Sequence, residues 1–223
     1  MTHVQRSRVI TVDPVVPTRV TLRAAADTLR AGGVVALPTE TFYGLAAAAL
    51  DAGSVKRIFE LKGRPETKPL LVLVDSVSMA ETVAHVNATA RDLMMRYWPG
   101  ALTLVLPALA SVPSIVTAGT GTLGVRLSPQ PIARGVVTLL AEPVTAPSAN
   151  PNGLTPPTTA AGVLGYFPDG IDLILDGGAT PGGQPSTVLD LTVDPPRILR
   201  QGAVLVRDIA PPPAGIQPSR TGS

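Results

Sequence analysis

The chain contains no cysteine and only two histidines among its 223 residues. Without cysteine it cannot form disulfides, thiolate metal sites or a cysteine nucleophile. His3 lies in the N-terminal stretch and His85 within a helical pattern, and neither belongs to a motif. A Ser–His–Asp mechanism and a histidine-rich metal site are therefore disfavoured.

Charged residues are also few: they make up 15% of the chain, against 45% hydrophobic residues. This balance indicates a globular chain, and the length suits one large domain. The net charge is only +2, although lysine supplies just three of the 18 basic residues and arginine the rest. Such a charge permits an anionic ligand without demanding a nucleic-acid partner.

Long apolar runs are missing as well. No apolar segment of signal-peptide length follows the basic residues at the start. The longest apolar stretch, 101–116, is interrupted by Pro107 and Pro113, so it could not cross a membrane as one helix. We expect an unexported protein located in the cytoplasm.

Short apolar runs alternate with helical patterns in the first half of the chain and follow one another in the second half. This order predicts an α/β fold with a mixed parallel and antiparallel sheet and packed helices. Helices are expected at 16–31, 51–61, 79–97 (with a break near Val86-Asn87), 131–140 and 158–166. Strands are expected at 34–37, 69–74, 102–106, 123–127, 144–146, 171–175, 187–191 and 197–199.

Polar side chains and glycines gather at the ends of the expected strands. Ligands of open α/β sheets bind at such strand ends, where loops present backbone N–H groups. The clusters lie at 38–45, 62–70, 119–126, 145–150, 183–187 and 199–202.

Four cations stand in these clusters among largely uncharged residues: Lys62, Arg64, Arg126 and Arg200. Arginine offers a planar fork for phosphate or carboxylate, and lysine a compact charge. No Walker A or Gly-x-Gly-x-x-Gly motif occurs between a strand and a helix. The set favours nucleotidyl transfer, which depends on positioning and charge neutralisation more than on a strong protein base.

Taken in this order, the clusters resemble the YrdC-like family over about residues 20 to 206. The motifs that carry the resemblance are Pro38-Thr-Glu-Thr-Phe-Tyr-Gly-Leu45, Lys62-x-Arg64, Trp98-Pro-Gly100, Ser148-x-Asn150, Pro185-Ser-Thr-Val188 and Leu199-Arg200. The resemblance implies a single twisted α/β sheet domain, at 18–208, with a large concave basic face. An N-terminal extension (1–17) and a Pro-rich, disordered tail (209–223) would flank it.

The implied activity is a nucleotidyl transfer. ATP, L-threonine and bicarbonate would give L-threonylcarbamoyladenylate and pyrophosphate. The product would serve the threonylcarbamoylation of adenosine 37 in tRNAs that read ANN codons. Implied partners are therefore the three substrates, and beyond them tRNA and the threonylcarbamoyl-transferase machinery.

The resemblance also assigns roles to residues. Those implied for threonine are Thr41, Arg126, Thr145 and Ser186, and those implied for ATP are Arg64, Thr122, Ser148 and Arg200. Those implied for catalysis are Lys62, Arg64, Ser148 and Asn150. Mg²⁺ would arrive with the ATP phosphates, since no carboxylate cage is evident and no metal ligand is assigned.

Each motif also has a plain structural interpretation. Thr39, Glu40 and Thr41 are typical of a helix cap after proline. Lys62 with Arg64 suits a solvated helix C-terminus, and Ser148 with Asn150 suits a turn.

Two other functions stay open at this point. A concave arginine-rich face would suit an RNA-binding module, although the seven aromatic residues and the absence of a basic run give it little support. A carbamoyl-transfer domain of the same fold is the other alternative.

Overall fold

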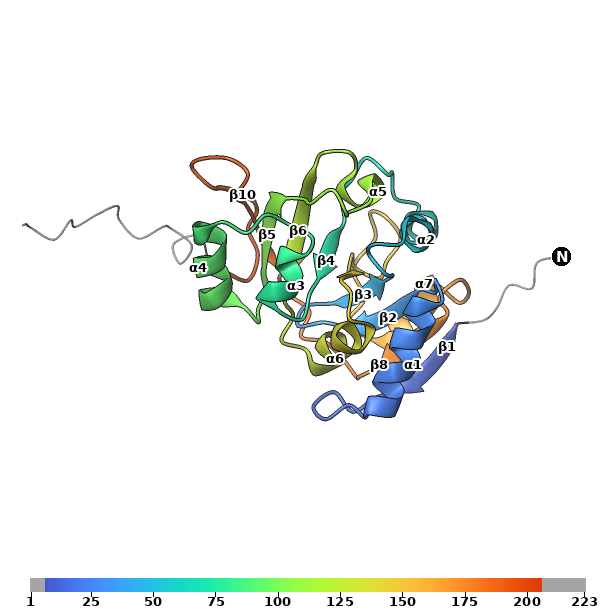
Figure 1. Cartoon of the computed structure of the whole chain (residues 1–223). Coiled ribbons are helices and arrows are strands. Elements are labelled where there is room, and N and C mark those ends of the chain that lie inside the picture. Colours follow the sequence, from blue (N-terminus) through green and yellow to red (C-terminus); the bar gives the residue numbers. More distant parts are fainter. Residues whose placement is uncertain (1–6, 206–223) are drawn as a thin grey trace, which may run out of the picture.

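The computed structural model describes residues 7–205, in which strands and helices interleave along the chain (Figure 1). The strands are β1 (Arg8–Thr11), β2 (Val35–Pro38), β3 (Tyr43–Ala46), β4 (Leu71–Leu73), β5 (Leu102–Pro107), β6 (Thr122–Arg126), β7 (Val144–Thr145), β8 (Leu173–Asp176), β9 (Thr187–Asp190) and β10 (Arg197–Arg200). The helices are α1 (Arg19–Arg30), α2 (Ala52–Lys62), α3 (Val77–Glu81), α4 (Ala88–Tyr97), α5 (Ser114–Thr117), α6 (Pro131–Leu140) and α7 (Ala160–Tyr166).

Local sequence explains where several helices begin and end. The Thr18 hydroxyl caps α1 by accepting from the Thr21 amide, and the Asp51 carboxylate caps α2 by accepting from the Gly53 amide. Helix α2 ends at Gly63, whose φ of 56° is left-handed. The predicted break in 79–97 is confirmed, because Asn87 caps α4 through Ala90.

The strands form two hydrogen-bonded sheets, ordered β1-β8-β2-β3 and β10-β9-β5-β6-β4-β7. Both sheets mix parallel and antiparallel pairs. In the four-stranded sheet β2 is parallel to β8 and antiparallel to β3, and in the six-stranded sheet β6 is parallel to β4 and antiparallel to β5. The predicted α/β architecture with mixed parallel and antiparallel strands is confirmed. The strands form two hydrogen-bonded sheets, whereas a single twisted sheet was expected.

The two sheets meet along β3 and β7. Thr145 N donates to Ala47 O at 2.9 Å, and Leu45 N donates to Pro147 O at 2.8 Å. Strand β7 is only two residues long because Pro147 lacks an N–H and cannot extend the ladder. The junction is therefore a seam of a few hydrogen bonds between edge strands.

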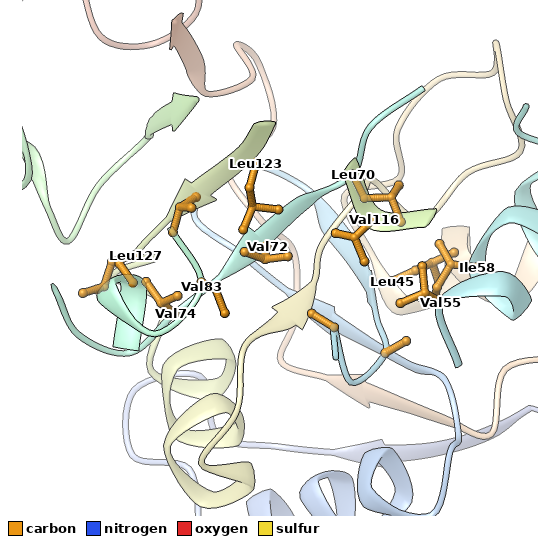
Figure 2. Packing of buried hydrophobic residues seen from close by; sticks show 14 of the residues in the cluster. Leu45, Val55, Ile58, Leu70, Val72, Val74, Val83, Val116, Leu123 and Leu127 are labelled. Carbon is orange, nitrogen blue, oxygen red and sulfur yellow. The ribbon is translucent and has the colours of Figure 1, made fainter. Parts of the chain in front are cut away.

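Two apolar cores lie on either side of the sheets. One includes Leu45, Ile58, Val72 and Val116 and packs helix α2 against the strands (Figure 2). The other packs α1 and α6 together, through Leu22 among others. The cores hold the strand ends that carry the polar clusters.

The sequence did not reveal strands at 8–11 or 43–46. Residues 8–11, placed in the predicted N-terminal extension, form β1 and pair in parallel with β8. The predicted tail, 209–223, lies outside the described residues, and the domain boundaries stay predictions. Within residues 7–205, no helix is long and apolar enough to cross a membrane.

Candidate functional site

A cavity of about 640 Å³ opens where the two sheets meet, within the size range of small-molecule sites. It is lined by residues of β3, β4, β5, β6, β9 and β10 and by the loops that follow several of them. Seven of the ten predicted site residues line it: Thr41, Arg64, Thr122, Arg126, Ser148, Ser186 and Arg200. Fold topology thus brings together residues up to 159 positions apart in the sequence.

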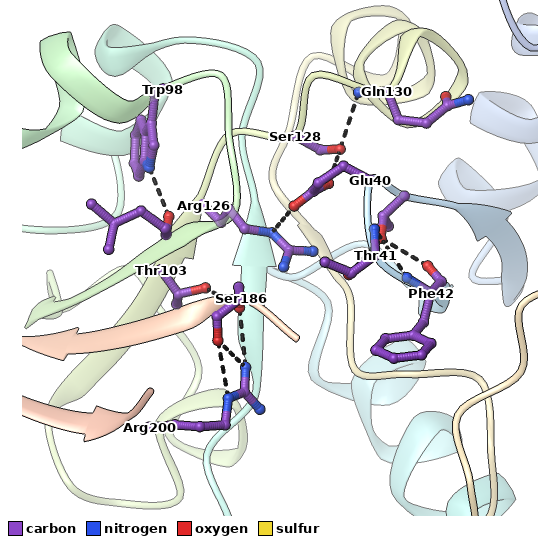
Figure 3. A network of polar contacts seen from close by, with 12 residues as sticks. Glu40, Thr41, Phe42, Trp98, Thr103, Arg126, Ser128, Gln130, Ser186 and Arg200 are labelled. Carbon is purple, nitrogen blue, oxygen red and sulfur yellow. Dashed lines mark hydrogen bonds and ion pairs between the residues drawn. The ribbon is translucent and has the colours of Figure 1, made fainter. Parts of the chain in front are cut away.

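Arg126 ends β6 and is only 3% exposed. Its Nε lies 3.3 Å from Oε1 of Glu40, and Figure 3 shows the guanidinium between Glu40 and Ser186. Burial lowers the pKa of Arg126, and the negative charge of Glu40 opposes this shift. The pair keeps a buried guanidinium charged at the cavity wall.

Arg200, at the end of β10, is held differently. Its guanidinium donates to the Ser186 carbonyl at 2.9 and 3.0 Å and to the Ser186 hydroxyl at 3.0 Å. The Ser186 hydroxyl also lies 2.9 Å from the Thr103 hydroxyl (Figure 3). Burial, and next the charge of Arg126, lowers the pKa of Arg200. These bonds orient Arg200, which has no acidic partner within residues 7–205.

Arg64 follows α2 and folds back on its own loop. It donates to the carbonyls of Pro69 at 2.9 Å and Lys68 at 3.3 Å. Partial burial lowers its pKa. The loop therefore fixes Arg64 at the cavity wall while leaving its charge without an acidic partner among the described residues.

Hydroxyl groups complete the lining. Thr41 is positioned by Thr39, whose hydroxyl accepts from the Thr41 amide at 3.2 Å, and Thr122 lies 2.9 Å from the Thr120 hydroxyl. The Ser148 hydroxyl has no hydrogen-bond partner within residues 7–205, which leaves it available to a ligand. The hydroxyls are thus spread around the arginines.

Lys62, predicted to be catalytic, does not line the cavity. It is 4% exposed, and its Nζ donates to the carbonyls of Ser148 and Asn150. Burial, and next the charge of Arg64, lowers its pKa to about 8. The structure places Lys62 as the anchor of the loop that carries Ser148, and its interpretation as a solvated helix terminus was wrong.

Asn150 and Thr145 also lie outside the cavity lining. Asn150 Nδ2 donates to the carbonyls of Pro151 at 2.9 Å and Leu154 at 2.6 Å, as the turn interpretation predicts. The buried Thr145 hydroxyl accepts from Ala47 N at 3.0 Å and donates to Leu45 O at 3.2 Å. Both hydrogen bonds of the Thr145 hydroxyl serve the seam, and the expected contact of Thr145 with threonine stays a prediction.

The sequence did not point to one residue of the site, Thr103, and the local structure expected for two others differs from the structure. Thr103 lies in β5, and its side chain lines the cavity together with that of Val105, two residues later on the same face of the strand. A polar residue within this otherwise apolar strand was the signal that could have indicated its role. Thr39 and Glu40 belong to the turn between β2 and β3, where Thr39 N donates to Phe42 O, so the helix-cap interpretation was wrong.

No carboxylate lines the cavity, and residues 7–205 hold no group of three or more acidic, histidine or cysteine side chains that could bind a metal ion. The lining therefore combines three cations with hydroxyls, which suits an anionic ligand.

The Sua5/YciO/YrdC family model, described as telomere recombination, matches residues 27–202. The chain belongs to this family. The predicted resemblance to YrdC-like proteins is thereby confirmed. The family match spans all three cavity arginines.

Among curated Sua5/YciO/YrdC relatives, the threonylcarbamoyl-AMP synthase of Pyrococcus abyssi (strain GE5 / Orsay) is 46% identical over 189 residues. These cover 84% of this chain and 56% of the relative. The threonylcarbamoyl-AMP synthase of Bacillus subtilis (strain 168) is 42% identical over 187 residues, which cover 83% of this chain and 54% of that relative. The chain thus spans about half the length of these two relatives.

The crystal structure of P. abyssi Sua5 complexed with L-threonine superposes with a TM-score of 0.88. The two proteins are 43% identical in sequence, and the superposed part covers 91% of this chain and 60% of the P. abyssi chain. The likeness extends across both sheets of this Sua5/YciO/YrdC chain.

Proposed function

We propose that this chain is a threonylcarbamoyl-AMP synthase, which uses ATP, L-threonine and bicarbonate and releases pyrophosphate. One observation carries the proposal: Arg64, Arg126 and Arg200 converge on a single hydroxyl-lined cavity in a chain whose relatives bear that name. Three fixed cations match the anionic groups of ATP and an amino acid.

Threonine would occupy the side of Arg126. A guanidinium fork binds a carboxylate through two parallel hydrogen bonds, and the hydroxyl of Thr41 lines the same wall. Ser186 offers a second hydroxyl there, already shared with Thr103 and Arg200. The L-threonine complex of P. abyssi Sua5 supports an amino-acid site in this fold.

ATP would occupy the side of Arg64 and Arg200, with the hydroxyls of Thr122 and Ser148 beside the phosphates. Arginines held by carbonyls keep their full charge and neutralise the charge that develops on the phosphates. Magnesium would enter as MgATP, because the cavity lining offers hydroxyls and cations but no carboxylate to hold the ion.

The reaction then needs two steps. The ammonium group of threonine first loses one proton to solvent, and the free amine then attacks the bicarbonate carbon to give a carbamate, releasing water. A carbamate oxygen attacks the α-phosphorus, the bond to the β-phosphate oxygen breaks, and pyrophosphate leaves. The protein contributes alignment and charge neutralisation, the effects on which such transfers depend.

The later fate of the product belongs to the same proposal. The adenylate would pass to the tRNA threonylcarbamoyl-transferase machinery, which modifies adenosine 37. We propose the cytoplasm as the location, where ATP and tRNA are both found.

Pyrophosphate release by the purified chain tests the proposal, with MgATP and with threonine and bicarbonate added singly and together. We expect release only when both are present, with a product of the mass of threonylcarbamoyl-AMP. RNA binding without turnover, or turnover with carbamoyl phosphate instead, would reject it in favour of an alternative function.

A further inference from the structure

The three arginines of the cavity differ in the partners that hold them. Arg64 and Arg200 donate to backbone carbonyls, and Arg200 also to a serine hydroxyl. Arg126 instead pairs with the Glu40 carboxylate at 3.3 Å. A carbonyl orients a guanidinium and leaves its charge, whereas a carboxylate neutralises it. The cavity thus has one wall of nearly zero net charge and two positive positions.

Glu40 is fixed behind Arg126 and does not itself line the cavity. Its side chain is 14% exposed, and Oε2 accepts a hydrogen bond from the hydroxyl of Ser128. The Ser128 oxygen in turn accepts from the Gln130 amide at 3.2 Å (Figure 3). A carboxylate tied down in this way cannot swing away from its arginine.

The contact with Glu40 uses only one edge of the guanidinium. Glu40 approaches Nε, and the two terminal nitrogens of Arg126 have no hydrogen-bond partner within the described part of the chain. Since Arg126 lines the cavity, these nitrogens remain for a ligand. Glu40 therefore changes the charge of the wall without blocking its hydrogen-bond donors.

We propose that Glu40 is a specificity-determining residue, which makes the Arg126 wall select a zwitterionic amino acid over a second anion. The inference rests on the proposed function. An amino acid carries no net charge, so its carboxylate can take Arg126 while its ammonium group is favoured by the field of Glu40. A phosphate at the same place would meet the Glu40 charge, and is directed to Arg64 and Arg200.

The test compares threonine with 3-hydroxybutyrate, which keeps the carboxylate and hydroxyl but lacks the ammonium group. Calorimetry without ATP gives the ratio of their affinities. In Glu40→Gln, which has the same shape but no charge, we expect the preference for threonine to fall roughly tenfold. We also expect pyrophosphate to compete with threonine in this variant. Loss of packing alone would weaken both ligands equally and leave the ratio unchanged.

Asp172→Asn is the matched control. It removes a carboxylate from another arginine pair, Arg57–Asp172 at 2.9 Å, which does not line the cavity. We expect it to keep the wild-type ratio.

Two results would overturn the inference: a wild-type affinity ratio in Glu40→Gln, or displacement of threonine by pyrophosphate in the wild-type protein. The second needs no variant, so a misfolded Glu40→Gln would not prevent the test. Failure of wild-type protein to bind threonine would instead reject the proposed function, and this inference with it.

Discussion

At the scale of single residues, the cavity separates groups that face a ligand from groups that hold them. Arg64 and Ser148 line the cavity, whereas Lys62 lies behind Ser148 and binds its carbonyl. All three belong to motifs that the sequence marked as catalytic. Only the folded structure separates their positions, because Lys-x-Arg spacing does not indicate whether the lysine is buried.

Removing a ligand-facing group should reduce synthesis and leave folding intact. We expect Arg64→Ala and Ser148→Ala each to lower kcat/KM for pyrophosphate release by roughly 10- to 100-fold, the worth of one hydrogen bond to a charged group. Both should unfold near the wild-type temperature. Full activity in both variants would contradict the assignment of these residues.

Lys62 should make stability depend on pH in the alkaline range. Its folded pKa of about 8 lies below the ordinary value of 10.5, so the unfolded state binds more protons between these values. Stability should therefore rise with pH, by about 2 kcal/mol between about pH 7.5 and about pH 9.5. Urea unfolding at both pH values would show this rise, and Lys62→Met should lack it.

At the scale of elements, one close contact fixes Ser186 and the start of β9, which follows it. A Cβ placed on Gly202 would lie 2.2 Å from Pro185 O and 2.6 Å from Thr187 N, in the backbone beside Ser186. Such distances are not tolerated without movement of the backbone. The turn after β10 therefore sets the position of β9 at the cavity wall.

Gly202→Ala should displace that strand. We expect a loss of about 1–3 kcal/mol in unfolding free energy, the usual cost of overpacking, together with weaker threonine binding. Gly165→Ala is the control, since a Cβ there meets nothing within 4 Å and the residue lies in α7. It should stabilise the chain by about 0.5–1 kcal/mol. Equal behaviour of the two variants would show that the contact does not matter.

At the scale of the whole molecule, the cavity depends on the seam between the sheets. The Thr145 hydroxyl joins β3 and β7 there, with no contact to the cavity. Its removal would leave Ala47 N and Leu45 O without their side-chain partner.

We expect Thr145→Val to cost about 1–3 kcal/mol of unfolding free energy, because buried polar groups lose a hydrogen bond. Amide exchange of Ala47 should accelerate more than that of Val136, which is buried in the core between α1 and α6. Uniform acceleration at both amides would instead indicate global destabilisation without a local role for the seam.

Much of this organisation was predictable from sequence, for physical reasons. Apolar runs such as 102–106 predict buried strands, and arginines at the ends of these runs predict the cavity wall. Both features can be predicted because each depends on residues that are neighbours in the sequence. The β3 strand was hidden because Tyr43-Gly44-Leu45-Ala46 has no alternation, and Glu40 was ambiguous because its partner is 86 positions away. Contacts between residues far apart in the sequence determine both the β3 strand and the partner of Glu40, and residue spacing along the chain does not reveal such contacts.

The order in which the cavity walls occur along the chain has a consequence for biosynthesis. Thr41 is made early, whereas Ser186 and Arg200 are 145 and 159 positions later, and β9 pairs with β5 and β10. A nascent chain on the ribosome therefore has neither a complete amino-acid wall nor a complete phosphate wall until Arg200 has emerged. Pairings of such long sequence separation also form slowly. Substrates can therefore assist folding only after Arg200 has emerged, and competence to bind them reports that both cavity walls are in place.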